Sequence, residues 1–303
     1  MRTLVTGATG CIGSRLVRVL HEAGHDVVAL VRDPARYDPP PGVTVAVGDL
    51  LGFGWEDALE GVDAAYYLVH SMGGGEGYAE RDRRAAHNFA AAAAEAGVDR
   101  VIYLGGLGDD DADLSPHLKS RREVEYILAE GDYDFTALRA GIIIGAGSTS
   151  FELVRQLAKR LPVMVTPKWV QTRCQPIALA DVIAYLAGVL DAPETRGETY
   201  EIGGPEVMTY ETVLRAVARI DHGREPVIIR VPVLTPWLSA LWLRLVTDVP
   251  TSVAHPLVLG LKNAVVVTDD RIREHVPLEP TPFETAVERA LGREPEPVPV
   301  EVA

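Results

Sequence analysis

The stretch LVTGATGCIGSRLV, residues 4–17, places Gly7, Gly10 and Gly13 between a strand-like run and a helix-like run. In a strand–loop–helix unit, one glycine permits a tight turn and a second lets the backbone approach a pyrophosphate. The third lets the helix pack closely on the strand. The helix that follows directs free N–H groups at the phosphates. The stretch therefore predicts a dinucleotide-binding unit, and the loop residues expected to contact the cofactor are Gly7, Thr9, Gly10, Cys11, Ile12 and Gly13.

Strand-like and helix-like runs alternate on both sides of this loop through the first half of the chain. The strand-like runs are residues 2–6, 26–31, 43–49, 63–70, 100–106 and 134–141, and helices are expected over 11–24, 79–96 and 116–130. Such alternation predicts a parallel sheet with helices on both faces, and right-handed crossovers make it doubly wound. The predicted fold class is α/β, a Rossmann doubly wound parallel sheet.

The pattern loosens after about residue 145. Helices are expected over 151–161 and 181–190, where Asp181 is expected to cap the second, and residues 198–204 read as a strand leading into a turn. We therefore predict a small C-terminal cap region over the sheet. The predicted regions are 1–145, an NAD(P)-binding Rossmann core; 146–291, the remaining sheet strands and a substrate cap; and 292–303, a loose Pro-rich tail.

Composition narrows the classes of function. The 303 residues carry a net charge of −14, which argues against a nucleic-acid surface because such a surface needs a basic patch. The most apolar window, 231–246, is interrupted by Pro232, Pro236 and Arg244 and is shorter than the roughly 20 residues of a membrane span. The two cysteines lack metal-like or C-x-x-C spacing, so no metal site and a cytoplasmic location are expected. Peripheral membrane contact, a protein complex and self-association are left open.

The tips of three strands supply further candidates for cofactor contacts. The second strand ends in LVRDPAR, 30–36, where Arg32 and Arg36 suit a 2′-phosphate and so favour NADP(H) over NAD(H). Asp33 keeps NAD(H) open, because a carboxylate there would bind the ribose hydroxyls. The remaining candidates are Asp49 and Leu50 after the third strand, near the adenine, and Val69 and His70 after the fourth, under the cofactor ribose.

Several segments together resemble the short-chain dehydrogenase/reductase superfamily of the extended, atypical kind. They are the T-G-x-x-G-x-x-G motif from Thr6 to Gly13, YYLVHSMG (66–73), VIYLGGLG (101–108), LSPHLKSR (114–121) and LRAGIIIGAGS (138–148). The chain is most similar to NmrA-like NAD(P)H-binding proteins, relatives of NAD-dependent epimerases and dehydratases, over about residues 1–290. The resemblance is specific for the fold and the cofactor, and it says little about the substrate.

The resemblance also implies a Ser at the end of the fifth strand and a Tyr-x-x-x-Lys pair on the next helix. Here Gly105 and Gly106 end that strand, and the pair positions hold His117 and Arg121. Histidine, with an ordinary pKa near 6.5, could donate a proton unaided, and arginine could hold the ribose. A nearby arginine, however, lowers the pKa of a histidine. His117 and Arg121 are the candidate catalytic residues.

We therefore expect an NADPH-dependent reductase of an unidentified apolar small molecule. The apolar character is suggested by a helix-spaced stripe at Trp237, Leu238, Leu241, Trp242 and Leu245. A second hypothesis, favoured by the glycines at 105 and 106, is a non-catalytic NAD(P)H-binding protein that senses redox state or serves a larger complex. A third, a sugar-nucleotide epimerase or dehydratase, is disfavoured because those enzymes normally use the Tyr-x-x-x-Lys pair.

Overall fold

The structure is a computed structural model that describes residues 1–71, 77–109, 112–161, 163–231, 248 and 251–295. Its centre is a seven-stranded sheet in the order β11-β6-β5-β4-β1-β2-β3, in which every neighbouring pair is parallel. The strands are β1 (Arg2–Thr6), β2 (Asp26–Val31), β3 (Thr44–Val47), β4 (Ala64–Tyr67), β5 (Arg100–Gly106), β6 (Asp134–Ala140) and β11 (Thr199–Ile202). The predicted doubly wound α/β fold is confirmed.

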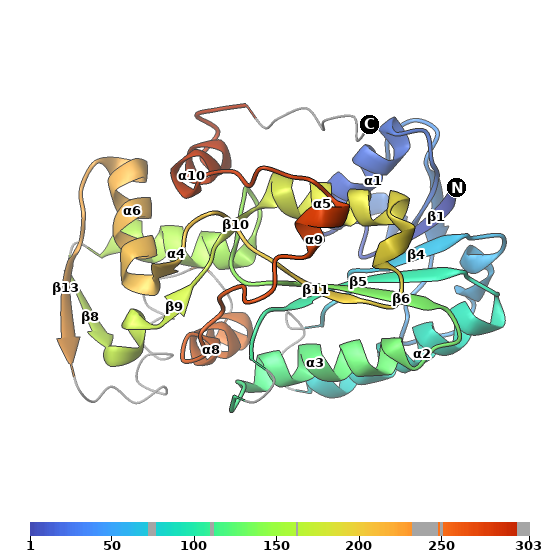
Figure 1. The fold of residues 1–303 in the computed structure, drawn as a ribbon, viewed down its shortest axis with the longest axis horizontal. Helices are drawn as coiled ribbons and strands as arrows, with labels where there is room; N and C mark the ends of the chain where they lie inside the picture. Colours follow the sequence, from blue (N-terminus) through green and yellow to red (C-terminus); the bar gives the residue numbers. More distant parts are fainter. Residues whose placement is uncertain (72–76, 110–111, 162, 232–247, 249–250, 296–303) are drawn as a thin grey trace.

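Helices cover both faces of the sheet, as Figure 1 shows. α1 (Gly13–Glu22) and α5 (Leu179–Asp191) pack together on one face, and α2 (Tyr78–Glu95) and α3 (Pro116–Ala129) on the other. Successive strand residues point to opposite faces, so Val5 and Tyr66 enter the core beneath α1 and α5, whereas Leu4 and Tyr67 enter the core above α2 and α3. Two buried layers therefore fix the sheet between the helix pairs.

The strand order reverses between β1 and β4, and the crevice at such a point, outside the carboxyl ends of the strands, is where ligands bind in this type of sheet. The predicted strands 43–49 and 63–70 end earlier, at Val47 and Tyr67. Residues 48–49 and 68–70 leave the sheet at this edge and are free to line a site.

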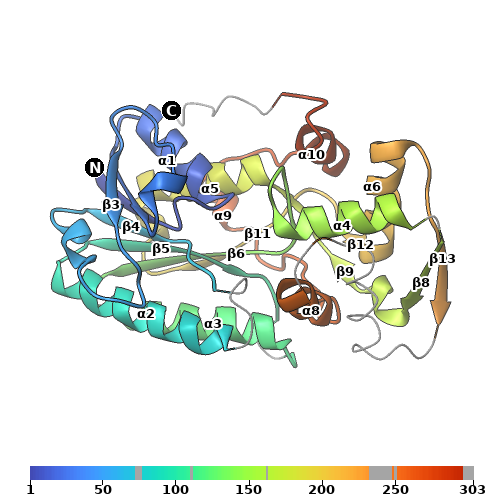
Figure 2. The same cartoon turned by 180° about the vertical axis from the view of Figure 1, so that it is seen from behind.

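A second group of elements, the cap, lies at one end of the sheet (Figure 2). Its helices are α4 (Thr149–Arg160), α6 (Tyr210–His222), α8 (Thr251–Gly260) and α10 (Phe283–Ala290). The cap also contains short strands that pair with one another. They are β7 (Ile143–Ile144) with β10 (Ile177–Ala178), β8 (Val163–Pro167) with β13 (Val227–Val231), and β9 (Arg173–Cys174) with β12 (Met208–Thr209). The short helix α9 (Ile272–His275) contacts β11.

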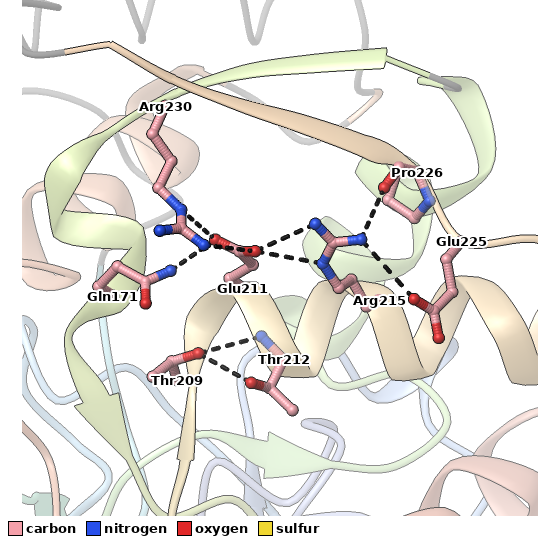
Figure 3. A network of polar contacts seen from close by, with 8 residues as sticks. All are labelled: Gln171, Thr209, Glu211, Thr212, Arg215, Glu225, Pro226 and Arg230. Carbon is pink, nitrogen blue, oxygen red and sulfur yellow. Dashed lines mark hydrogen bonds and ion pairs between the residues drawn. The ribbon is translucent and has the colours of Figure 1, made fainter.

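A buried carboxylate ties the cap elements to one another, as Figure 3 shows. Glu211 on α6 accepts hydrogen bonds from Arg230 on β13, with Nε 2.9 Å from Oε2, and from Arg215 one turn along α6. Gln171, in the turn after β8, donates to the same carboxylate. The Arg230 guanidinium holds the pKa of Glu211 below its usual value. The network joins α6, β13 and the turn after β8.

The structure bears differently on three predictions for the second half of the chain, which concern Asp181, the apolar stripe and the C-terminal tail. Asp181 does not cap α5; it lies in the first turn, where its carboxylate accepts from the backbone N–H (2.8 Å) and hydroxyl (2.7 Å) of Thr281. The apolar stripe at 237–245 lies outside the described residues. Of the predicted tail, residues 292–295 are described, and Arg293 donates there to the carbonyls of Ile220 and Asp221. None of the helices in the described ranges is both long and apolar enough to cross a membrane.

Candidate cofactor and substrate site

A pocket of about 340 Å³ opens at the carboxyl ends of β1, β2 and β4, at the point where the strand order reverses. It is formed by the glycine loop, the tips of β2 and β4, the segment after β3 and the first turns of α2. The lining residues are Thr6, Gly7, Thr9, Gly10, Leu30, Val31, Arg32, Gly48, Asp49, Leu50, Leu51, Leu68, Val69, His70, Ser71, Arg81 and Ala85.

The glycines of the loop differ in what they make possible. Gly7 has a φ of +67° and lies so close to β4 that a Cβ would be 2.9 Å from the Leu68 carbonyl oxygen. A Cβ on Gly13 would be 2.3 Å from the Gly7 carbonyl oxygen, so this glycine permits the close start of α1. Gly10 lines the pocket, where a side chain would stand between loop and ligand. Gly7 therefore permits the turn, Gly10 leaves space for a ligand, and Gly13 permits the close packing of α1.

The other loop candidates divide between the pocket and the interior. Thr9 lines the pocket. Cys11 faces away from it, with its Sγ 3.3 Å from the Ala146 carbonyl oxygen in the loop after β7. Ile12 precedes the first residue of α1 and packs against the core on the α1 face. Cys11, Ile12 and Gly13 are therefore not among the lining side chains, although their backbone forms the start of the helix below the pocket.

Of the two arginines predicted to bind the cofactor near the end of β2, one lines the pocket. Arg32 is exposed and lines the pocket, whereas Arg36 belongs to the short turn Pro34–Arg36 and does not line it. Asp33 uses its Oδ1 to accept the backbone N–H of Ala35, 3.1 Å away, and so begins that turn. Asp49 and Leu50 both line the pocket, and their contact with an adenine stays a prediction.

The first turns of α2 supply lining residues that sequence reasoning missed. Arg81 and Ala85 are four residues apart on α2, and both face the pocket. Both residues could have been predicted from the sequence, because a helix that follows β4 must begin at the edge of the sheet where β4 ends. Thr6 was also missed as a lining residue; its hydroxyl bridges the Tyr66 carbonyl and the Leu68 N–H, which holds β4 against β1.

His70 is paired with a buried carboxylate from the same helix. Its Nδ1 lies 2.8 Å from Oδ2 of Asp82, and Oδ1 of Asp82 accepts the backbone N–H of Ser71 at 2.7 Å. Burial raises the pKa of Asp82, but the hydrogen bonds from His70 and Ser71 outweigh it and hold that pKa below its usual value. Asp82 is therefore ionised at neutral pH, and it fixes the Nδ1–H tautomer of His70.

His117 lies in the first turn of α3, next to His70, with ring centroids 5.2 Å apart. Ser115 caps this helix as its predicted start requires, and Asn263 holds Ser115 by accepting its backbone N–H at 3.0 Å. Burial, with the positive charges of His70 and Arg121, lowers the pKa of His117 to about 3. His117 is therefore neutral at pH 7.

Arg121 is buried one turn further along α3. Its guanidinium donates to the Leu104 carbonyl at the end of β5 and reaches the Val69 carbonyl at 3.5 Å, and it lies 4.9 Å from the centre of the Tyr103 ring. The predicted pair, His117 and Arg121, thus stands beside His70 and Val69 of the pocket wall. Neither side chain itself lines the 340 Å³ pocket.

The end of β5 has no room for the serine that the resemblance implies. A Cβ on Gly105 would be 2.9 Å from Cε1 of Tyr103 and 3.1 Å from Oε2 of Glu125, and one on Gly106 would be 2.9 Å from Cδ2 of Leu118. The space of a Ser side chain is therefore already filled by residues of β5 and α3.

The chain matches the family model described as NAD(P)H-binding over residues 7–192. It is 30% identical to the ceramide reductase of Caulobacter vibrioides over 75% of this chain and 73% of that protein. It is 26% identical to a mitochondrial NADH dehydrogenase [ubiquinone] 1 alpha subcomplex subunit 9 of Arabidopsis thaliana, over 88% and 70%. A 3-beta-hydroxysteroid dehydrogenase of Mycolicibacterium neoaurum matches at 34% over 34% of this chain and only 31% of its own length.

A solved structure gives the same answer at the level of the fold. The nucleoside-diphosphate-sugar epimerase of Staphylococcus aureus superposes with a TM-score of 0.73 at 16% identity, over 97% of this chain and all of that one. The glycine loop, the position of the pocket and these similarities all indicate a protein that binds NAD(P)H. The chain belongs to the NAD(P)H-binding family of Rossmann-fold proteins, whose relatives include atypical short-chain dehydrogenases and reductases.

Proposed function

We propose that the protein is an NADPH-dependent reductase of an apolar carbonyl compound. The observation that carries this proposal is the pocket at the strand-order reversal, with Gly10 on its floor and Arg32 on its rim. In this proposal Gly7, Thr9 and Gly10 hold the pyrophosphate, Asp49 and Leu50 the adenine, and Val69 and His70 the ribose nearest the nicotinamide. When bound, the cofactor supplies a hydride to the substrate.

The preference for NADPH rests on two neighbouring side chains. Arg32 is exposed at the tip of β2, where it can pair with a 2′-phosphate, and Arg81 lines the same pocket from α2. Asp33, the residue that would favour NAD, is engaged by the N–H of Ala35.

The substrate end of the site is assigned to His117 and Arg121. His117 would hydrogen-bond the substrate oxygen through its neutral ring, and Arg121 would steady the cofactor ribose from its place beside Val69. An apolar substrate is supported by two relatives, the ceramide reductase and the 3-beta-hydroxysteroid dehydrogenase, since the ceramides and steroids in their names are apolar molecules.

Calorimetric titration of the full chain with NADPH and, separately, NADH tests the cofactor. We expect NADPH to bind more tightly, and Arg32→Ala to weaken NADPH binding by roughly tenfold to a hundredfold, as for loss of one charge-assisted phosphate contact, while leaving NADH binding unchanged. Arg36→Ala is the matched control and should leave both affinities unchanged. Equal loss for both cofactors in Arg32→Ala would refute the assignment of Arg32.

NADPH oxidation with long-chain ketones, sterol ketones and quinones then tests the reaction. Reduction of none of these by a protein that binds NADPH tightly would favour the second candidate, a non-catalytic NAD(P)H-binding subunit. The filled space at Gly105 and Gly106 and the similarity to the Arabidopsis NADH dehydrogenase subunit favour that candidate.

A further inference from the structure

Two buried ring nitrogens stand without partners at the substrate end of the site. Among the described residues, neither Nε2 of His70 nor Nδ1 of His117 has a hydrogen-bond partner, although both atoms are enclosed. A buried nitrogen without a hydrogen bond is costly because it has lost its water partner and gained none. The centroids of the two rings are 5.2 Å apart, and the other nitrogen of His70, Nδ1, is hydrogen-bonded to Asp82.

We propose that Asp82, His70 and His117 form a proton relay that delivers a proton to the substrate oxygen through His117. The proposal rests on the reductase function proposed above and adds Asp82 and His70 to its chemistry. It assigns a use to both unpartnered nitrogens: once the two rings turn so that these atoms form a hydrogen bond, Nε2 of His70 hands a proton to Nδ1 of His117.

The proton transfer balances without a charged His117. His70 first takes up a proton from water at Nε2, which makes it an imidazolium whose Nδ1–H is held by Asp82, and it then gives up that Nε2 proton. His117 accepts that proton at Nδ1 and releases the proton on Nε2 to the substrate oxygen, so it only exchanges one neutral tautomer for the other. The substrate carbon gains a hydride and its oxygen a proton, and His70 is left neutral until it regains a proton from water.

The surrounding charges place the stored proton on His70. Asp82 and Tyr78 face His70 from α2, and Arg121 approaches both histidines from α3. Of the two histidines, His70 is the one that contacts the Asp82 carboxylate. Burial lowers the pKa of His70, and the Asp82 hydrogen bond partly offsets that effect, whereas the pKa of His117 falls to about 3. The first proton therefore goes to His70, and reduction should slow as rising pH removes it.

Nitrogen NMR of the full chain with ¹⁵N-labelled histidine tests where the proton resides, without any substrate. Between pH 8 and pH 4 we expect His70 to hold the Nδ1–H tautomer and to take up a proton before His117. Asp82→Asn should lower the pKa of His70 and remove its tautomer preference. His87→Gln, an exposed histidine on the same helix, identifies a peak and is the control that leaves both signals in place. Protonation of His117 before His70 would overturn the relay.

Kinetics with the ketone or quinone that the wild type reduces fastest separates the relay from a structural role. Asp82→Asn should lower kcat by about 10²-fold or more, with NADPH affinity unchanged and the fall of rate at high pH displaced, and His70→Gln should lower kcat at least as much. An unchanged kcat in Asp82→Asn would also overturn the relay. A wild type that reduces nothing defeats the proposed function instead, and the NMR titration then decides separately whether Asp82 and His70 hold the proton.

Discussion

Gly105 lies where the resemblance to dehydrogenases implies a serine, and the residues packed around it explain why a glycine is present. The Tyr103 ring that a side chain at 105 would meet is fixed, because its hydroxyl donates to the Arg121 carbonyl at 3.0 Å and its face stacks on Phe135. Glu125, on the other side, is buried and bound to Arg139. Neither neighbour is the free end of a flexible chain, so the glycine is a packing requirement.

Restoring the serine at this position should therefore damage the protein. We expect Gly105→Ser and Gly105→Ala each to lower the free energy of unfolding by about 1–3 kcal/mol, as overpacked sites do. Urea unfolding followed by circular dichroism measures the change. Gly260→Ala is the matched control, because a Cβ there meets only Oγ of Ser115 at an ordinary 3.6 Å. A stable Gly105→Ser variant with raised reductase activity would contradict the packing argument.

At the scale of elements, the cap depends on Glu211. Its side chain is 8% exposed, while its partners Arg230 and Arg215 are 53% and 34% exposed, so solvent screens the pairs in part. We expect Glu211→Gln to lower the free energy of unfolding by about 1–3 kcal/mol at pH 7, because two arginines lose a charged acceptor. Glu225→Gln, a rim residue 3.7 Å from Arg215, should cost far less.

The pH dependence of that cost has a definite sign. The folded-state pKa of Glu211 lies below its usual 4.5, so the pair stabilises the folded protein above about pH 4.5 and loses its contribution as pH falls through the folded value. Urea titrations between pH 7 and pH 3 should show the difference in the free energy of unfolding between the wild type and Glu211→Gln shrinking as pH falls. A difference that does not change with pH would assign the effect to packing.

At the scale of the whole molecule, cofactor binding should stabilise the fold, because the pocket is made from β1, β2, β4 and α2 together. A ligand that binds only the folded chain adds about 2.7 kcal/mol at 100 times its Kd. For a chain of this size each kcal/mol raises Tm by roughly 2 °C. We expect NADPH to raise the Tm in thermal unfolding, and to raise it less in Arg32→Ala at the same concentration. No rise with either cofactor would mean that the folded chain binds neither of them at that concentration.

The sequence by itself determined the sheet, the glycine loop and eight of the seventeen residues that line the pocket. Strand and helix periodicity is local, so runs such as 26–31 and 100–106 coincide with β2 and β5 as observed. Parallel strands bring their carboxyl ends to one edge, which is why Arg32, Asp49 and His70 could be predicted to share a site from their places at strand tips.

Only the tertiary structure decided which side chains meet across that edge. Asp82 follows His70 by twelve residues, and no local pattern marks the two as partners; the position of α2 brings Asp82 to 2.8 Å from His70. Asp181 reads as a helix cap, yet Thr281, a hundred residues away, takes its carboxylate. Such pairings arise because burial removes water as the alternative partner, and the packing of distant elements determines which group replaces it.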